Sequence, residues 1–310
     1  MQGRCAAELV LGSVQLGVAY GAANRTGKPS RATALRLVRK ATDAGITQFD
    51  TARAYGDSED RLGEALTGKK TIRAITKLSP LSELSPTASR DEIRDAVDAS
   101  IAQSLAALRR DRLDCLLLHR AEHMRSFGGA IWDRLIERLE DGSILSLGVS
   151  VQSPEEALVA LDCADVRHLQ LPFNLLDSRW RRTGVIDRIM ARTGVTIHAR
   201  SVFLQGILAA NDASLWPRVD SVDAVALVGM MANLTQEFGR ESPADLCLAY
   251  ARGQNWVDGI VVGLETEDQL DDNLRLFLHR PLVAGECAEI DARIPELPAQ
   301  LLNPAFWPKP

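Results

Sequence analysis

The sequence lacks any apolar run long enough to cross a membrane, and it has few cysteines. A spanning helix needs about 20 predominantly apolar residues, and every apolar run here is much shorter. The five cysteines are an odd number, are widely spaced and form no C-x-x-C pair, which argues against a disulfide framework and a thiolate zinc site. We therefore expect a cytoplasmic protein with no membrane span and no secretion signal.

Positive charge is also limited and dispersed. The chain has 36 Lys and Arg against 41 Asp and Glu, a formal net charge of -5. Its basic residues occur singly or in pairs such as Lys69-Lys70. Nucleic acids and anionic membranes are bound by clusters of basic side chains, so neither is expected as a partner.

Several motifs with known chemistry are missing as well. There is no G-x-G-x-x-G, and the Gly12 to Gly17 spacing lacks the Lys-Ser/Thr of a phosphate-binding loop. No H-x-H, H-E-x-x-H or clustered carboxylate pattern is present, so we expect no metal site. These absences argue against a Rossmann domain and against the metal-dependent hydrolases.

What the sequence does contain is an alternation of short apolar runs with longer segments of helical period. Residues 30–44 and 91–110 show the 3.6-residue period of amphipathic helices. Apolar strands that each precede a helix imply a parallel sheet covered on both faces, and eight such units favour a closed (β/α)8 TIM barrel. We expect one domain over residues 1–310, with strands at 9–14, 46–50, 72–77, 115–119, 145–150, 168–172, 195–201 and 259–262.

Two segments do not follow this alternation. Residues 212–238 show no clear period, and we expect a loop insertion after the seventh strand. The segment from about 295 is rich in proline, which predicts an irregular C-terminal surface segment. Its Phe306 and Trp307 would need apolar surface to cover.

Ionisable residues end several strands. Asp50, Lys77 and His119 close the second, third and fourth runs, and Tyr55 follows Asp50 by five residues. In a TIM barrel the carboxyl ends of all strands meet at one mouth. A nearby ammonium group favours the ionised form of a phenol, so Lys77 would make Tyr55 a better general acid. Asp50 would hold Lys77, and His119 could donate a hydrogen bond to a carbonyl oxygen. The hydride would have to come from a cofactor, because no side chain can supply one.

On these residues the sequence resembles the aldo-keto reductase superfamily over nearly its whole length. The family pattern Asp-Thr-Ala-x-x-Tyr-Gly-x-Ser-Glu-x-x-Leu-Gly is present at residues 50–63 without a departure. The resemblance implies a (β/α)8 barrel and NAD(P)H-dependent interconversion of an aldehyde or ketone with an alcohol. It assigns the catalytic tetrad to Asp50, Tyr55, Lys77 and His119.

The resemblance extends to residues that would hold the nicotinamide. Gly-Val-Ser at 148–150 resembles the family's Gly-Val-Ser-Asn, in which Val151 replaces the Asn. The family's carboxamide-binding Gln matches Gln170, and Arg200 replaces a Tyr that stacks on the nicotinamide; a planar guanidinium can stack too. The cofactor contacts implied on this side are Gly12, Ser13, Ser150, Gln170, Arg200 and Ser201.

The resemblance is weaker at the adenosine side. Residues 262–273 resemble the family's adenosine-binding segment, and Asn273 matches the Asn that contacts adenine. The family usually has Lys or Arg here for the 2′-phosphate of NADPH, whereas this chain has no basic residue between Arg252 and Arg275. We expect NADP(H) by resemblance, with NAD(H) or dual use open. The contacts implied on this side are Gly263, Thr266, Gln269 and Asn273.

Variable loops would form the substrate walls, with Val14, Tyr20, Phe203 and Trp307 as candidates. Few strongly apolar residues are available there, which favours a small sugar-like or hydroxylated carbonyl compound. The sequence does not indicate an oligomeric state. Two other functions stay open: a nicotinamide-binding barrel that senses redox state and regulates a partner, and a barrel enzyme that uses Lys77 as a Schiff-base nucleophile.

Overall fold

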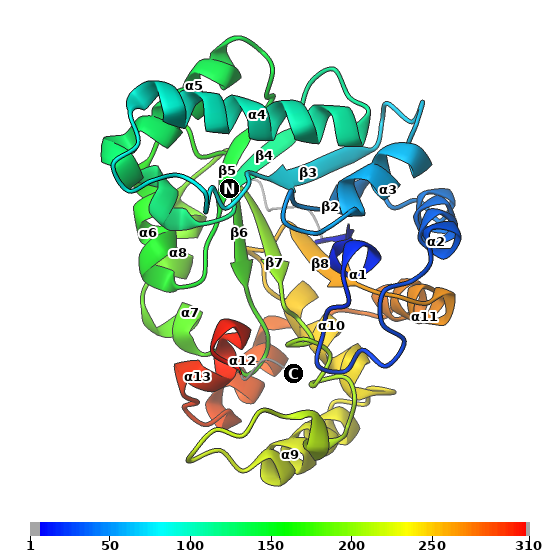
Figure 1. Cartoon of the computed structure of the whole chain (residues 1–310). Coiled ribbons are helices and arrows are strands. Elements are labelled where there is room, and N and C mark those ends of the chain that lie inside the picture. The colour runs from blue at the N-terminus through cyan, green and yellow to red at the C-terminus, as the bar shows by residue number, and fades with distance from the viewer. Residues whose placement is uncertain (1–6, 308–310) are drawn as a thin grey trace.

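Eight parallel strands close into a barrel in chain order (Figure 1). The computed structural model of the chain describes residues 7–307; Cys5 and the tail residues 308–310 lie outside them. The predicted (β/α)8 barrel is confirmed, and each predicted strand is present with its ends shifted by at most two residues. The strands are β1 (Glu8–Gly12), β2 (Gln48–Asp50), β3 (Arg73–Lys77), β4 (Cys115–Leu118), β5 (Leu147–Ser150), β6 (His168–Pro172), β7 (Thr196–Arg200) and β8 (Gly259–Gly263).

Helices surround the barrel and begin at recognisable caps. Helix α4 starts with a capping box, in which Ser89 and Glu92 satisfy each other's backbone donors. Proline at the first turn, after a serine cap, starts both α6 and α10. The α-helices are α1 (Val14–Gly17), α2 (Arg31–Asp43), α3 (Ser58–Ala65), α4 (Arg90–Leu108), α5 (Ala130–Glu140), α6 (Pro154–Asp162), α7 (Arg179–Arg182), α8 (Val185–Ala191), α9 (Ala224–Glu237), α10 (Pro243–Arg252), α11 (Glu267–Phe277), α12 (Ala284–Arg293) and α13 (Ala299–Leu302).

The barrel has two apolar regions, one inside the ring of strands and one between strands and helices. Alternate residues of a strand point to opposite faces, so Cys115 and Leu117 join the inner cluster while Leu116 and Leu118 join the outer one. The interior also holds the rings of His168 and His198, whose centres are 4.2 Å apart. This packing leaves the polar residues that end the strands at the mouth.

The expected loop insertion after the seventh strand is only partly correct. Residues 201–223 form a long connection, but Ala224–Glu237 is a regular helix, α9, at the lower edge of Figure 1. Its Asp223 cap accepts from the Ala226 amide. The first half of α9 is apolar on nearly all sides, so its sequence shows no clear helical period.

The C-terminal segment also differs from its prediction. Residues Ala299–Leu302 form one helical turn, α13, with Leu301 and Leu302 buried. The prolines flank this turn, where they do not interrupt helical hydrogen bonds. Trp307 packs partly against the core and donates a hydrogen bond from its indole to the Leu301 carbonyl, at 3.0 Å. Phe306 stays 63% exposed and covers no apolar surface.

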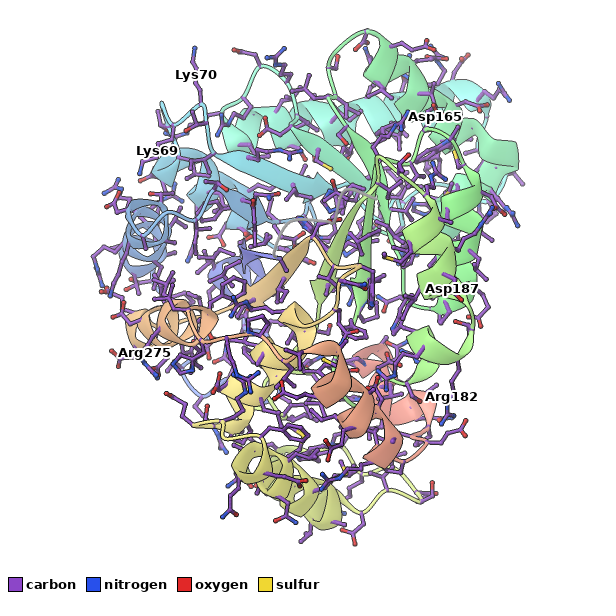
Figure 2. All side chains as sticks on the ribbon, turned by 180° about the vertical axis from the view of Figure 1, so that it is seen from behind. Lys69, Lys70, Asp165, Arg182, Asp187 and Arg275 are labelled. Atoms are coloured by element: carbon purple, nitrogen blue, oxygen red, sulfur yellow. The ribbon has the colours of Figure 1, made fainter. Side chains whose placement is uncertain are left out.

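Charged side chains are spread over the outside. In Figure 2 the labelled cations Lys69 and Arg275 lie on the left side of the molecule and Arg182 lies on the right. Among residues 7–307, no helix is both long and apolar enough to cross a membrane.

Candidate active site

The structure brings Asp50, Tyr55, Lys77 and His119 together at the barrel mouth; we call these four residues the tetrad. The Lys77 ammonium donates to both carboxylate oxygens of Asp50, at 2.7 and 2.8 Å, and to the Thr51 carbonyl at 2.9 Å. It lies 5.0 Å from the centre of the Tyr55 ring. The Tyr55 and His119 rings meet edge to face, with centres 5.7 Å apart. A phenol, an ammonium group and an imidazole therefore share one small volume.

Burial sets the charges of the tetrad. Burial works against the charge of Lys77, but the Asp50 carboxylate and the Tyr55 phenol outweigh it, so the pKa of Lys77 lies above its ordinary value. Burial, assisted by the cations Lys77 and Arg200, lowers the pKa of His119 to about 3. At neutral pH Lys77 is thus charged and His119 is neutral.

The same contacts argue against Lys77 as a nucleophile. Its side chain is 1% exposed, and its ammonium group has three N–H donors, which match the three oxygens of Asp50 and Thr51. A Schiff base needs a neutral, accessible amine. This arrangement suits a fixed charge instead.

Two glycines let the loop that carries Tyr55 pack against the start of the chain. A Cβ on Gly17 would lie 1.8 Å from the Tyr55 carbonyl oxygen. Gly56 has a φ of +58°, and a Cβ there would lie 2.5 Å from the Gly17 carbonyl oxygen. The close approach of the two backbones fixes where Tyr55 enters the mouth.

Ser58 and Glu59, which belong to the family pattern at residues 50–63, hold this loop in place through hydrogen bonds. The Ser58 hydroxyl donates to the Ser13 hydroxyl at 2.7 Å, which donates in turn to the Asp50 carbonyl at 2.7 Å. Glu59 is 1% exposed and accepts from the Thr76 hydroxyl at 2.6 Å. Ser13 is fully buried, so it supports Asp50 and does not line a cavity.

Gln170 and Ser150 lie on neighbouring strands at the same level, because they are register partners of β6 and β5. The Gln170 amide nitrogen donates to Asp50 Oδ1 at 2.6 Å. Its amide oxygen is buried and has no partner within residues 7–307. A buried acceptor without a donor is costly, and the amide of a nicotinamide is a donor of the required kind. These residues therefore fit a nicotinamide cofactor.

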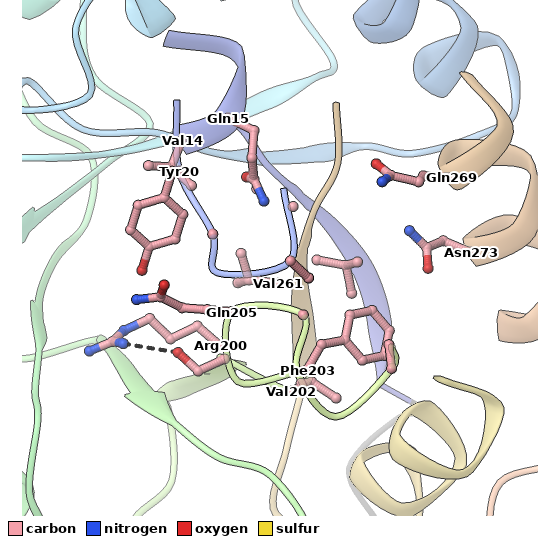
Figure 3. A pocket seen from close by; sticks show the side chains of 18 of the residues that line it. Val14, Gln15, Tyr20, Arg200, Val202, Phe203, Gln205, Val261, Gln269 and Asn273 are labelled. Atoms are coloured by element: carbon pink, nitrogen blue, oxygen red, sulfur yellow. Dashed lines mark hydrogen bonds between the residues drawn. The ribbon is translucent and has the colours of Figure 1, made fainter. Parts of the chain in front are cut away.

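Arg200, at the end of β7, extends along the cavity wall (Figure 3). Its guanidinium donates to the Val151 carbonyl at 3.0 Å and to the Ser201 hydroxyl at 3.3 Å. The side chain of Val151 is fully buried. The position that the family fills with Asn thus offers its backbone oxygen to Arg200, while its side chain packs in the core.

A cavity of about 680 Å³ runs from the tetrad to helix α11. In Figure 3, Tyr20, Gln205 and Arg200 lie on one side of it, and Gln269 and Asn273 lie on the other. Five predicted residues do not line it. Trp307 packs elsewhere, Thr266 caps α11, and Ser13, Lys77 and Gln170 are buried. Predicted residues that do line it are Gly12, Val14, Tyr20, Asp50, Tyr55, His119, Ser150, Arg200, Ser201, Phe203, Gly263, Gln269 and Asn273.

At the end of the cavity beside α11, which we call the distal end, Gln269 and Glu265 are already paired with each other. Gln269 forms the capping box of α11, and its amide oxygen accepts from the backbone of Glu265 at 2.8 Å and of Thr266 at 3.3 Å. Its amide nitrogen donates to the Glu265 carboxylate at 3.1 Å. Burial raises the pKa of Glu265, which is 8% exposed.

Arg275 is the basic side chain that lines this distal end, and it is paired twice. It contacts Glu241 at 2.6 Å and Asp272 at 3.1 Å. A side chain at Gly263 would displace Gln15, because a Cβ there would lie 2.2 Å from the amide oxygen of Gln15. The distal end therefore lacks an unpaired cation for a 2′-phosphate within the described residues.

Sequence reasoning missed several residues of the cavity and its supports. Gln15, Gln205 and Arg275 line the cavity, and no motif marked them. Glu59 could have been found, because it belongs to the pattern at residues 50–63. Gln205 lies in a turn where Ser201 and Gln205 have positive φ values of 61° and 55°, a conformation that sequence rarely indicates outside glycine.

Residues 7–307 contain no group of three His, Cys, Asp or Glu side chains that could hold a metal ion.

A family model, the Aldo/keto reductase family, matches residues 8–294. The chain belongs to this family. Membership implies NAD(P)H-dependent carbonyl reduction.

Known proteins of this family are similar at moderate identity. An L-glyceraldehyde 3-phosphate reductase of Escherichia coli (strain K12) is 23% identical over 294 residues, covering 83% of this chain and 82% of that protein. A 6-dehydroglucose reductase of Novosphingobium aromaticivorans is 32% identical over 127 residues, 38% of this chain and 41% of that protein. The structure of aldo-keto reductase AKR11C1 from Bacillus halodurans, in a holo form, has a TM-score of 0.72 at 21% identity, covering 92% of this chain and 91% of that chain. This last match shows the same fold.

Proposed function

We propose that this aldo/keto reductase reduces a small aldehyde or ketone to an alcohol, with Tyr55 as the proton donor. The observation that carries the proposal is the position of the Lys77 ammonium, 5.0 Å from the Tyr55 ring and fixed by Asp50. A fixed positive charge stabilises the phenolate that remains after proton transfer.

Each tetrad residue has a distinct role in this reaction. Tyr55 donates a hydrogen bond and then its proton to the carbonyl oxygen as that oxygen gains negative charge. Lys77 stabilises the phenolate, and Asp50 holds Lys77 in place. The neutral His119 imidazole donates a second hydrogen bond to the same oxygen. The nicotinamide cofactor, when bound, supplies the hydride, and the phenolate regains its proton from solvent.

The chain's own residues would hold the nicotinamide and disfavour a 2′-phosphate. Ser150 and the free amide oxygen of Gln170 would bind the carboxamide. At the distal end, Glu265 is an acceptor suited to a ribose hydroxyl, and Gln269 is engaged in the helix cap. We therefore propose that NAD(H) is used at least as readily as NADP(H).

The substrate is proposed to be a polar, hydroxylated carbonyl compound. The cavity wall near the tetrad includes the polar side chains of Tyr20, Asn24 and Gln205. Two relatives are named for carbonyl compounds of this kind, an L-glyceraldehyde 3-phosphate reductase and a 6-dehydroglucose reductase.

The Tyr55→Phe variant tests the proposal. Purified protein should consume NADH or NADPH in the presence of small aldehydes, and the variant should lose two to four orders of magnitude in kcat, the range for a general acid. Its dissociation constant for the cofactor should stay within about twofold of wild type, because the ring remains. Equal turnover by wild type and variant would contradict the assignment. Cofactor binding without turnover in wild type would favour the redox-sensing regulator.

A further inference from the structure

The charges at the tetrad end of the cavity do not cancel. Lys77 is balanced by Asp50, and His119 is neutral at pH 7. Arg200 adds a positive charge, and its two hydrogen-bond partners within residues 7–307, the Val151 carbonyl and the Ser201 hydroxyl, are both neutral. Within residues 7–307 no carboxylate lies within ion-pair distance of Arg200. This end of the cavity therefore has one uncompensated positive charge.

The uncompensated charge is beside the residues that fit a nicotinamide. Gln170 presents its free amide oxygen from β6, and Ser150 is its register partner on β5. Arg200 is the register partner of Pro172, two residues beyond Gln170 on the same strand. The guanidinium donates to the Ser201 hydroxyl, and in Figure 3 Arg200 lies on the same side of the cavity as Gln205 and Tyr20. A ring whose carboxamide is bound by Gln170 has Arg200 as a neighbour on the adjacent strand.

We propose that Arg200 makes this site discriminate between the oxidation states of the cofactor, so that it binds NAD(P)H in preference to NAD(P)+. The inference rests on the proposed function, because it requires a bound nicotinamide. The oxidised ring carries a positive charge and the reduced ring is neutral, while the rest of the dinucleotide is identical in both. Only the oxidised form is repelled by Arg200. The neutral reduced ring can also stack on the planar guanidinium.

The expected effect is large enough to measure. Two unit charges about 7 Å apart, at an effective dielectric constant of about 20, repel with an energy that corresponds to roughly fiftyfold in a dissociation constant. Water and ions at the open side of the cavity reduce this value. We therefore expect the ratio of the dissociation constants, NAD(P)+ over NAD(P)H, to depend on Arg200 by a factor of about ten or more.

The discrimination would favour the reductive direction. After hydride transfer the site contains an oxidised cofactor beside Arg200, and repulsion speeds its release. Exchange for a reduced cofactor then starts the next cycle. A cell with abundant reduced cofactor would keep the site filled, whichever nicotinamide dinucleotide is used.

Equilibrium binding tests the proposal without any substrate. Dissociation constants for the oxidised and reduced forms of the tighter-binding cofactor are measured by calorimetry for wild type, Arg200→Gln and Arg200→Lys. The ratio should fall about tenfold or more in Arg200→Gln and stay within about threefold of wild type in Arg200→Lys, which keeps the charge. The matched control is Arg275→Gln at the distal end, which should change both constants by the same factor.

Three outcomes would overturn the proposal. The first is a ratio in Arg200→Gln equal to that of wild type. The second is an equal fall in Arg200→Gln and Arg200→Lys, which would assign the effect to the shape of the guanidinium. The third is an unchanged ratio with a KM increase in Arg200→Gln confined to carbonyl substrates that carry a carboxylate or phosphate, which would make Arg200 a substrate anchor. Failure of wild type to bind either oxidation state would instead reject the proposed function.

Discussion

The two ends of the cavity differ in how their polar groups are held. At the tetrad end, side chains on strands β2, β3 and β6 bond to one another inside the barrel, and Gln170 still has an unpaired oxygen. At the distal end, Gln269 and Glu265 are bonded within the cap of α11. The comparison indicates that Gln170 keeps an unpaired acceptor at the tetrad end, whereas Gln269 and Glu265 serve local structure at the distal end.

This difference suits the two ends to different roles, chemistry at the tetrad end and cofactor selectivity at the distal end. A rigid strand end can hold an ammonium group 1% exposed beside a phenol, which suits chemistry that tolerates little movement. A helix cap can exchange one polar residue for another at low cost, since a capping interaction contributes about 1 kcal/mol. Cofactor selectivity at the distal end is therefore the easier property to change.

Breaking one ion pair at each end should give the largest difference between the two ends, measured as the loss in free energy of unfolding. Lys77→Met leaves the Asp50 carboxylate buried without its partner and should lower the free energy of unfolding by about 3–5 kcal/mol. Arg275→Gln removes contacts whose partners, Arg275 and Glu241, are 49% and 42% exposed, and it should cost at most about 1 kcal/mol. Urea denaturation followed by circular dichroism measures both. Equal losses would show that the buried pair contributes no more than the exposed one.

The barrel and its tetrad could be predicted because local sequence determines them. The run Cys115–Leu118 is buried on both faces and has no alternation, so its pattern is visible without tertiary information. Asp50 and Lys77 are the last residues of such runs. A strand-end position in a barrel is enough to bring them together.

The features that sequence reasoning missed or misplaced depend on contacts between segments that are distant in the sequence. Gln15 reaches the cavity because Gly263 has no side chain, and the two are far apart in the sequence. The aromatic ring of Trp307 predicts a place in the substrate wall, but the turn α13 directs this side chain to the core. The uncompensated charge of Arg200 is a property of its surroundings, since a sequence does not show which carboxylates will be absent from a site.

The interior histidines predict that the stability of the barrel is sensitive to acid. Burial lowers the pKa of His198 to about 4 and that of His168 well below its ordinary value, while both titrate near 6.5 when unfolded. Below pH 6.5 the unfolded chain binds protons that the folded chain does not. The free energy of unfolding should thus fall as pH drops from about 6.5 to 4, by roughly 1.4 kcal/mol per pH unit for each histidine.

The His198→Gln variant removes one of the two histidines, so it measures how much His198 contributes to this pH dependence of stability. Carboxylates titrate alike in wild type and variant, so the difference between their slopes of unfolding free energy against pH reports His198 alone. Urea denaturation at pH 7, 6 and 5 should give a slope lower by roughly 1.4 kcal/mol per unit in the variant. Parallel slopes would mean that His198 is already protonated in the folded barrel.

The smallest expected effect is a gain of cofactor affinity at the distal end. Gln269→Arg places a guanidinium in the cavity wall and should tighten NADPH about tenfold relative to NADH, as expected for a charge-assisted hydrogen bond to phosphate. Loss of the capping box should cost about 1 kcal/mol of stability. Dissociation constants from fluorescence titration measure the first effect. Asp268→Arg, a neighbour on the same turn that does not line the cavity, adds two units of charge where Gln269→Arg adds one, and is therefore a stringent control for long-range attraction.

The wild-type constants decide whether the comparison of the two ends holds. If wild type binds NADPH a hundredfold more tightly than NADH, the distal end recognises the 2′-phosphate despite its paired cation, and the role assigned to Glu265 is wrong. If Gln269→Arg and Asp268→Arg raise NADPH affinity equally, long-range attraction explains the gain. A tenfold gain confined to Gln269→Arg would show that the capping interaction of Gln269, and not the shape of the cavity, keeps a phosphate from being recognised here.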